Sequence, residues 1–207
     1  MEDWGSIITG IMALLIAIGL PLLYRKSKKE QDGKTSEIHQ HLRALGVDAT
    51  VAEAGDAREK VGLGRASGQK SEGVIAVADR HIDSVNVVSI STQYGTRYLV
   101  DYLVRSANLA GERPLKKTKL TKRSSPPLFG RVVAIGWQGD SSLAQDLNLD
   151  YSLADRLLKA EGKVVTGSVG IFPEPGHGYT RIRTDYSLPP AGAFEALCSI
   201  ARRIQAW

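Results

Sequence analysis

The chain begins with an apolar run from Ile7 to Leu23 that contains no charged residue. As a helix of about 17 residues rising ~1.5 Å each, the run reaches ~26 Å, close to the thickness of the hydrocarbon core of a bilayer. Trp4 and Tyr24 bracket it, where amphipathic rings lie in the two membrane interfaces. The sequence therefore predicts a transmembrane anchor over residues 1–24.

A cleaved signal peptide and a buried core helix fit this segment less well. A signal peptide has a positively charged start and a small-x-small cleavage site, whereas Glu2 and Asp3 are acidic and no such site follows. A buried core helix is usually amphipathic, whereas this run is apolar on all sides. A retained single span is the preferred interpretation.

The flanks of the span predict its orientation. Basic residues prefer the cytoplasmic side, so we expect a single-pass protein of the cell membrane with its N-terminus outside and the following domain in the cytoplasm. The single cysteine, Cys198, is compatible with that reducing compartment. Small residues four apart within the span also predict a homodimer through close helix packing. These residues are the pairs Ser6/Gly10 and Ala13/Ala17, and the basic flank consists of Arg25, Lys26, Lys28 and Lys29.

Residues 25–72 form the second predicted segment. After the basic flank we expect a short helix at Ser36–Leu45, a weaker helix at Val47–Lys60 and a linker rich in Gly and Ser at Val61–Gly73. The spacing Gly62-x-Gly64-x-x-x-Gly68 resembles a dinucleotide-binding turn. A polar segment precedes it in place of a buried strand, so a linker is the preferred interpretation.

Residues 73–207 are predicted to form one cytoplasmic α+β domain. Patterns of period two predict strands at 74–78, 84–91, 97–105, 131–135, 163–172 and 179–186. Helices are predicted at 141–160, with a break near Asn148-Leu149-Asp150, and at 190–206. The predicted fold class is thus α+β, with one N-terminal transmembrane helix followed by a mixed strand and helix domain that ends in a helix.

The closing helix carries an apolar stripe at helical spacing. The stripe contains Phe194, Leu197, Cys198, Ala201 and Ile204, so Cys198 is predicted to be a packed core thiol. The tetrapeptide Asp-Tyr-Ser-Leu precedes both late helices, and it places Ser152 and Ser187 as predicted N-caps.

A Gly-rich turn, Gly136 to Leu143, leads from a predicted strand into a helix. Free backbone N–H groups at such a turn suit an anion, which makes Gly136, Gly139 and Ser142 candidate ligand-binding residues. The alternative is that Asp140 or Ser142 simply caps the helix.

The Gly-Asp-Ser sequence within this turn, which includes Asp140 and Ser141, resembles the nucleophile block of the GDSL-type hydrolases. The resemblance covers three or four residues, stands late in the chain and lacks the later Asp-x-x-His of that family. The resemblance implies a hydrolase. Used together with His177 from a later loop, the turn would serve a hydrolase or a phosphate-ester enzyme, with Asp140, Ser141 and His177 as the candidate catalytic residues.

The loop Pro173 to Gly178 is a second candidate site. His177 beside a glutamate, with Arg181 and Arg183 in the next strand, suits an acid or base next to an anion clamp. An ordinary hairpin loop is the alternative. His39 and His41 point in different directions on a helix, so we predict no metal site and no cofactor.

The third candidate is a polybasic stretch at 112–127. It contains Arg113, Lys116, Lys117, Lys119, Lys122 and Arg123. Together with the four basic residues after the span it holds ten of the 27 basic residues, and the remaining 17 stand against 22 acidic ones. A solvated loop is the default for such a run, and contact with anionic lipid headgroups, shared with the first basic cluster, is the functional alternative. Nucleic acid is a weaker alternative because the stretch contains no aromatic residue for stacking.

These observations predict a membrane-anchored protein whose cytoplasmic domain binds a partner or a ligand and does not act as an enzyme. The alternatives are a tethered hydrolase that uses the 136–142 turn with His177, and a nucleic-acid-binding protein that uses residues 113–123.

Overall fold

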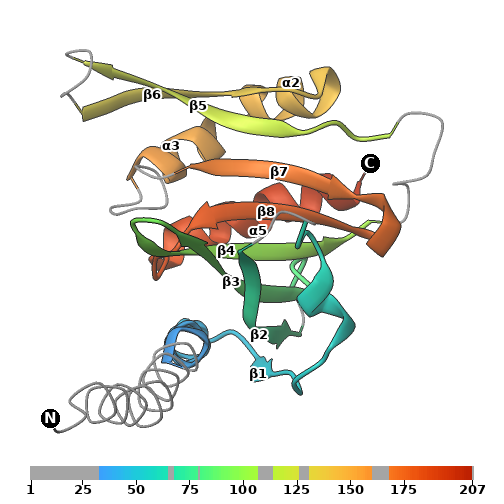
Figure 1. The fold of residues 1–207 in the computed structure, drawn as a ribbon. Helices are drawn as coiled ribbons and strands as arrows, with labels where there is room; N and C mark the ends of the chain where they lie inside the picture. Colours follow the sequence, from blue (N-terminus) through green and yellow to red (C-terminus); the bar gives the residue numbers. More distant parts are fainter. Residues whose placement is uncertain are drawn as a thin grey trace, which may run out of the picture.

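The computed structural model describes residues 33–64, 68–78, 80–106, 114–125, 131–159 and 168–206. These residues form one eight-stranded sheet in which every paired strand is antiparallel to its neighbour (Figure 1). The strand order is β1-β2-β3-β4-β8-β7-β5-β6. The strands are β1 (Ala49–Val51), β2 (Gln69–Val77), β3 (Ser84–Thr92), β4 (Gly95–Arg105), β5 (Thr118–Ser125), β6 (Arg131–Gln138), β7 (Val169–Glu174) and β8 (Tyr179–Asp185).

The α-helices pack on one face of this sheet. A helix at 33–44, α2 (Ser141–Leu149), α3 (Tyr151–Lys159) and α5 (Ala191–Gln205) contribute side chains to one core with the strands. Two short 3-10 helices, η1 (Ala57–Lys60) and η2 (Pro175–His177), lie in loops. In Figure 1, α5 lies behind the sheet and the loop with η1 lies in front of it.

The alternation in β4 explains how the sheet has two different faces. Tyr102 and Val104 are buried against the helices, while Leu103 and Asp101 point to the other face. The predicted β3–β4 hairpin is confirmed, and Gly95 at its turn has a φ of +121°, which favours glycine.

The predicted helices near the C-terminus are also confirmed. All five residues of the apolar stripe in α5 are buried, so Cys198 is a core thiol, and burial raises its pKa to about 11. The predicted break at Asp150 separates α2 from α3. The predicted serine caps are wrong, because Asp150 accepts the Leu153 N–H and Pro190 stands at the N-cap of α5.

The predicted fold class is wrong. In place of a mixed strand and helix domain behind a transmembrane helix, the strands form a single antiparallel sheet with the α-helices on one face, in which β4 and β8 pair across a large sequence separation. Within the described residues no helix is long and apolar enough to cross a membrane. The predicted anchor at 1–24, with its small-residue pairs, and the basic cluster at 25–29 lie outside the described residues. An apolar run of sufficient length is necessary for a span but does not by itself establish one.

Three local predictions are also corrected. The weak helix at Val47–Lys60 is replaced by β1 and η1, because Ala49–Val51 pairs with β2. The predicted linker ends early, since β2 already begins at Gln69. Half of the polybasic stretch is strand β5, because lysines are well tolerated in a hairpin near a sheet edge.

Candidate functional site

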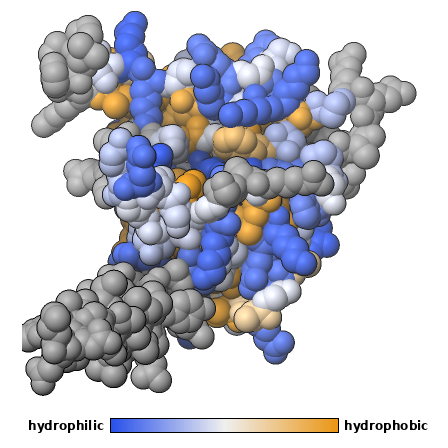
Figure 2. Space-filling model, viewed as in Figure 1, coloured by the Kyte–Doolittle hydropathy of each residue, from blue (hydrophilic) through white to orange (hydrophobic). Residues whose placement is uncertain are grey.

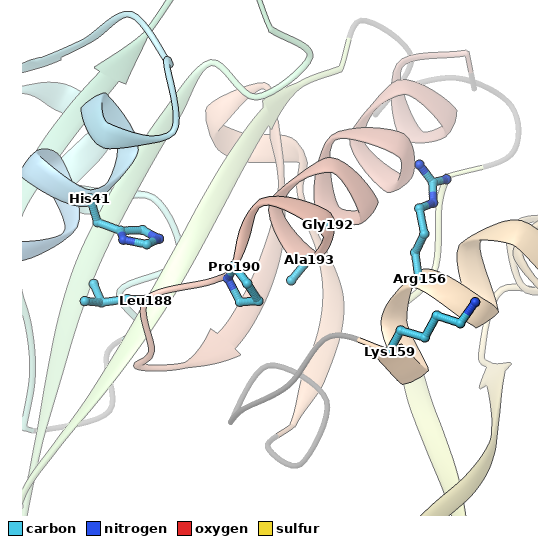
Figure 3. Close-up of a pocket in the computed structure, with 7 residues that line it drawn as sticks. All are labelled: His41, Arg156, Lys159, Leu188, Pro190, Gly192 and Ala193. Atoms are coloured by element: carbon cyan, nitrogen blue, oxygen red, sulfur yellow. The ribbon is translucent and has the colours of Figure 1, made fainter.

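A pocket of about 540 Å³ opens on the helical side of the molecule, between the helix at 33–44, α3 and the start of α5. Figure 3 shows the first turn of α5 in the middle, with His41 and Leu188 on one side and two basic side chains of α3 on the other. The described residues that line it are His41, Arg156, Lys159, Leu188, Pro190, Gly192 and Ala193.

The N-terminus of α5 lines this pocket without a side-chain cap. Pro190 stands at the N-cap position, where it accepts backbone N–H bonds from Ala193 and Phe194 but has no capping side chain. No acidic residue occupies the first turn. The first N–H groups of a helix lack intrahelical partners and form the positive end of the helix dipole, so this end of α5 favours an anion.

Two basic side chains from the last turn of α3 add positive charge. Arg156 is half-buried, and its Nη2 donates to Ser199 Oγ at 3.2 Å, which holds the guanidinium against α5. Lys159 is exposed and pairs with Asp155 at 2.7 Å, an arrangement that water screens and that a ligand can compete with.

His41 connects the helix at 33–44 to the same pocket. Its Nε2 lies 2.7 Å from the carbonyl oxygen of Pro189, and a carbonyl only accepts, so this nitrogen carries the proton. Leu188, Pro190 and Ala193 give the pocket apolar surface beside these polar groups. The arrangement is suited to a molecule with one anionic group and an apolar body.

Gly192 keeps the pocket open. A Cβ built on Gly192 would meet no atom within 4 Å, so the space next to this helical residue is empty. A Cβ at this position would therefore enter the space of the pocket without touching a described atom.

The Gly136 to Ser142 turn has structural roles. Asp140 Oδ1 accepts the N–H groups of Ser142 and Leu143 at 3.2 and 3.1 Å, and Asp140 Oδ2 accepts the Lys116 N–H at 3.1 Å. The predicted helix cap is confirmed. Gly139 has a φ of +139°, and a Cβ on it would lie 2.1 Å from the Lys117 carbonyl oxygen. Both residues therefore serve the contact between this turn and the segment before β5.

His177 lies away from the Gly-Asp-Ser sequence. Asp140 N–H donates to Thr118, which pairs with Ile171 in β7. From Ile171, β7 continues for three residues, ~10 Å, before the turn that carries His177. Among the described residues, no hydrogen bond joins His177 to Asp140 or to the exposed Ser141.

Arg181 and Arg183 bind carboxylates of the protein itself. Arg183 forms two bonds of 2.7 Å with Asp101, which is fully buried, and Arg181 donates to Asp101 at 3.1 Å and to Glu174 at 2.9 Å. Gly62 lies directly on Arg181, because a Cβ on it would come within 1.9 Å of Nε. These predicted anion-clamp residues lie together on the sheet face opposite the helices.

The described polybasic residues lie just before and within β5, the first strand of the β5–β6 hairpin. Lys116 and Lys117 precede β5, while Lys119, Lys122 and Arg123 lie within it, and Arg113 lies outside the described residues. Burial lowers the pKa of Lys122. Contact of these residues with lipid headgroups stays a prediction.

Sequence reasoning missed the pocket because its described lining comes from three separate segments of the chain. The only local signal was a proline before a helix with no acidic residue in its first turn, which leaves the helix N-terminus unneutralised. Among the described residues, no group of three or more His, Cys, Asp or Glu side chains is arranged to hold a metal ion. No family model matches this chain, and neither a curated protein nor a solved structure is significantly similar to it.

Proposed function

We propose that this domain is a ligand-binding module that takes a small organic anion with an apolar body at the N-terminus of α5. The observation that carries the proposal is the uncapped start of α5, which opens into a pocket beside Arg156 and Lys159.

The magnitudes support binding of moderate strength. A helix N-terminus stabilises a nearby anion by about 0.3–1 kcal/mol at an exposed site and up to about 2 kcal/mol at a partly buried one. Arg156 and Lys159 add a weaker, longer-range attraction, because the Arg156 guanidinium donates to Ser199, about two turns further along α5, and points away from its first turn in Figure 3. The volume of about 540 Å³ lies in the range of small-molecule sites.

We favour binding over hydrolysis because of the hydrogen bonds and the positions of the candidate catalytic residues. Both carboxylate oxygens of Asp140 accept backbone N–H groups, and His177 lies at the far end of β7. A nucleophile and its base need to be within hydrogen-bond reach of each other.

Thermal unfolding in the presence of three small probes tests the proposal. Phenyl phosphate and octanoate should raise the melting temperature of the chain, whereas benzylammonium, which is apolar but cationic, should not. Gly192→Leu should abolish the response, since its side chain extends into the pocket. Without ligand this variant should remain folded, because a Cβ at Gly192 meets no atom within 4 Å and leucine is a better helix former than glycine.

Matched charge variants separate the pocket from general charge effects. Arg156→Gln should weaken binding of phenyl phosphate about two- to tenfold, while Arg43→Gln, an exposed position outside the pocket lining, should leave it unchanged. Equal responses of the parent and Gly192→Leu to phenyl phosphate would refute the proposed site.

A further inference from the structure

The described residues cover the sheet face opposite the helices over only part of its width. The loop with η1 lies over β2 and β3, where Asn86 Nδ2 donates to the carbonyls of Arg58 and Glu59 at 3.3 Å. Val61 packs on Leu103 and Tyr179 next to it. In Figure 1, no labelled helix lies in front of β7 or β5 on this side.

The register places one aromatic ring and several cations on this uncovered part. Gly170 of β7 pairs with Lys119 of β5 and with Arg183 of β8, so these positions lie in one row on one face. Phe172, two residues along β7, lies on the same face and leans over Gly170, where a Cβ would approach the ring to 2.6 Å. We call Lys117, Lys119, Arg123, Gly170 and Phe172 the open platform.

Lys117 of the open platform and two arginines of β8 lie around the Phe172 ring. Lys117 Nζ lies 4.7 Å from the ring centroid, and the guanidinium carbons of Arg181 and Arg183 lie 5.1 and 6.0 Å from it. Lys117 is exposed, so its flexible side chain can move aside for another group, whereas Arg181 is buried and held by Asp101 and Glu174.

The charges left over on this face are positive. Asp101 and Glu174 are paired with the two arginines of β8, and Asp185 is paired with Arg97. Lys119 and Arg123 are exposed, and they form no ion pair with the described residues. Figure 2 shows this side with hydrophilic surface along the β5–β6 hairpin at the top and apolar patches beside it.

We infer that the open platform binds single-stranded nucleic acid, with a base stacked on Phe172 and the backbone phosphates along Lys117, Lys119 and Arg123. The basic stretch lacks an aromatic residue in sequence, and the fold supplies one from a strand about fifty residues later. An aromatic ring among exposed cations on a sheet is the combination that single strands need, because bases stack while phosphates are neutralised. This site is independent of the proposed pocket, which lies on the helical side.

Fluorescence anisotropy with a labelled twelve-residue oligo-dT or oligo-U, on the 207-residue chain, tests the inference. Binding should be detected at 50 mM salt. A plot of the logarithm of the binding constant against the logarithm of the salt concentration should have a slope of about −0.7 for each phosphate neutralised. Phe172→Leu keeps an apolar side chain over Gly170 but removes the ring, and it should weaken binding about five- to 100-fold. Phe172→Tyr keeps a ring and should retain affinity.

Two charge variants complete the design. Lys119→Gln should lower affinity and reduce the salt slope by about 0.7, whereas Arg202→Gln, an exposed residue of α5 on the other side, should change neither. The same variants are measured on vesicles of phosphatidylcholine and phosphatidylserine in a 7:3 ratio. Three outcomes would each overturn the inference. They are nucleic-acid binding that Phe172→Leu leaves unchanged, no binding to either oligonucleotide, and binding confined to the vesicles.

Discussion

Asp101 shows how a single residue connects the two halves of the sheet. It is fully buried in β4, and its two oxygens accept three hydrogen bonds from the two arginines of β8, at 2.7 to 3.1 Å. Removing one partner of a buried pair leaves an uncompensated charge, which costs about 3–5 kcal/mol. Glu174 balances the second guanidinium, so the cluster contains as many acidic as basic groups.

Asp150 is the residue for which a pH dependence is expected. Its Oδ1 accepts the Ser152 hydroxyl at 2.7 Å and the Leu153 N–H at 2.9 Å, and its Oδ2 accepts Arg203 Nη2 at 2.7 Å. These bonds, the Ser152 hydroxyl first, lower the pKa of Asp150 to about 2. Because the folded-state pKa lies below the unfolded one, the stabilisation is present above about pH 4 and is lost as the pH falls toward 2.

Asp150→Ala should therefore cost about 1–2 kcal/mol in free energy of unfolding at pH 7, from the lost cap and ion pair. The difference from the parent should shrink as the pH falls from about 4 to about 2. Urea unfolding at several pH values measures it, with Asp155→Ala, an exposed position in α3, as the control that changes little. A cost that stays constant with pH would contradict the pairing.

Sequence reasoning at the residue scale worked where the rule is local. The cap by Asp140 and the core position of Cys198 both follow from neighbouring residues. The roles of Arg181 and Arg183 did not follow, since their carboxylate partner lies about 80 residues earlier and becomes adjacent only through β-pairing. The alternation of period two predicted on which face of β4 Asp101 lies, but it did not predict that Asp101 is buried.

At the scale of elements, β6 is notable because it is the last strand of the sheet and carries few charges. An edge strand of this kind invites pairing with another chain. Two features limit this. Asn148 of α2 accepts the Trp137 N–H at 2.8 Å and donates to its carbonyl at 3.0 Å, so a side chain occupies the outer edge there. The pairing with β5 also skips Val133, which makes a bulge.

Asn148→Ala should expose the edge of β6 at Trp137. We expect a small loss of stability, about 0.5–1.5 kcal/mol, and a clear increase in self-association with concentration. Light scattering after gel filtration measures the association, and Gln145→Ala, exposed on the same helix, is the control. If both variants remain as monodisperse as the parent, Asn148 has no role in protecting the edge.

Element prediction succeeded for hairpins and helices whose pattern lies within one stretch of chain, such as β3–β4 and α5. It failed for β1, which is three residues long and exists only because Ala49 to Val51 pair with β2. It also failed for β5, because a run of lysines has the composition of a loop although its backbone pairs with β6.

For the whole molecule, the helix at 33–44 belongs to the same core as the sheet. Ile38 and Leu42 are buried in one cluster with α5 and the central strands, although the sequence placed them in a segment before the domain. His41 and Tyr186 add hydrogen bonds between this helix and the chain near β8, at 2.7 Å to the Pro189 carbonyl and 3.2 Å to the Lys34 carbonyl.

Leu42→Ala should consequently lower the free energy of unfolding by about 2–5 kcal/mol, the cost of a cavity in a packed core. Urea unfolding followed by both far-ultraviolet circular dichroism and tryptophan fluorescence should show one shared transition. Arg43→Ala, the exposed neighbour, is the control. A loss below about 0.5 kcal/mol, or two separate transitions, would show that the helix is an appendage.

The pairing of β4 with β8 has a consequence for synthesis of the chain. Leu99 pairs with Asp185, so β4, the longest strand described, gains its second neighbour only after roughly 80 further residues have been translated, ~4–16 s at ordinary rates. Throughout that interval the nascent chain carries a long strand, with a run of residues that the fold later buries, whose second edge has no partner. Slower translation of the segment between β4 and β8 lengthens the time in which that edge is open to other chains or to chaperones.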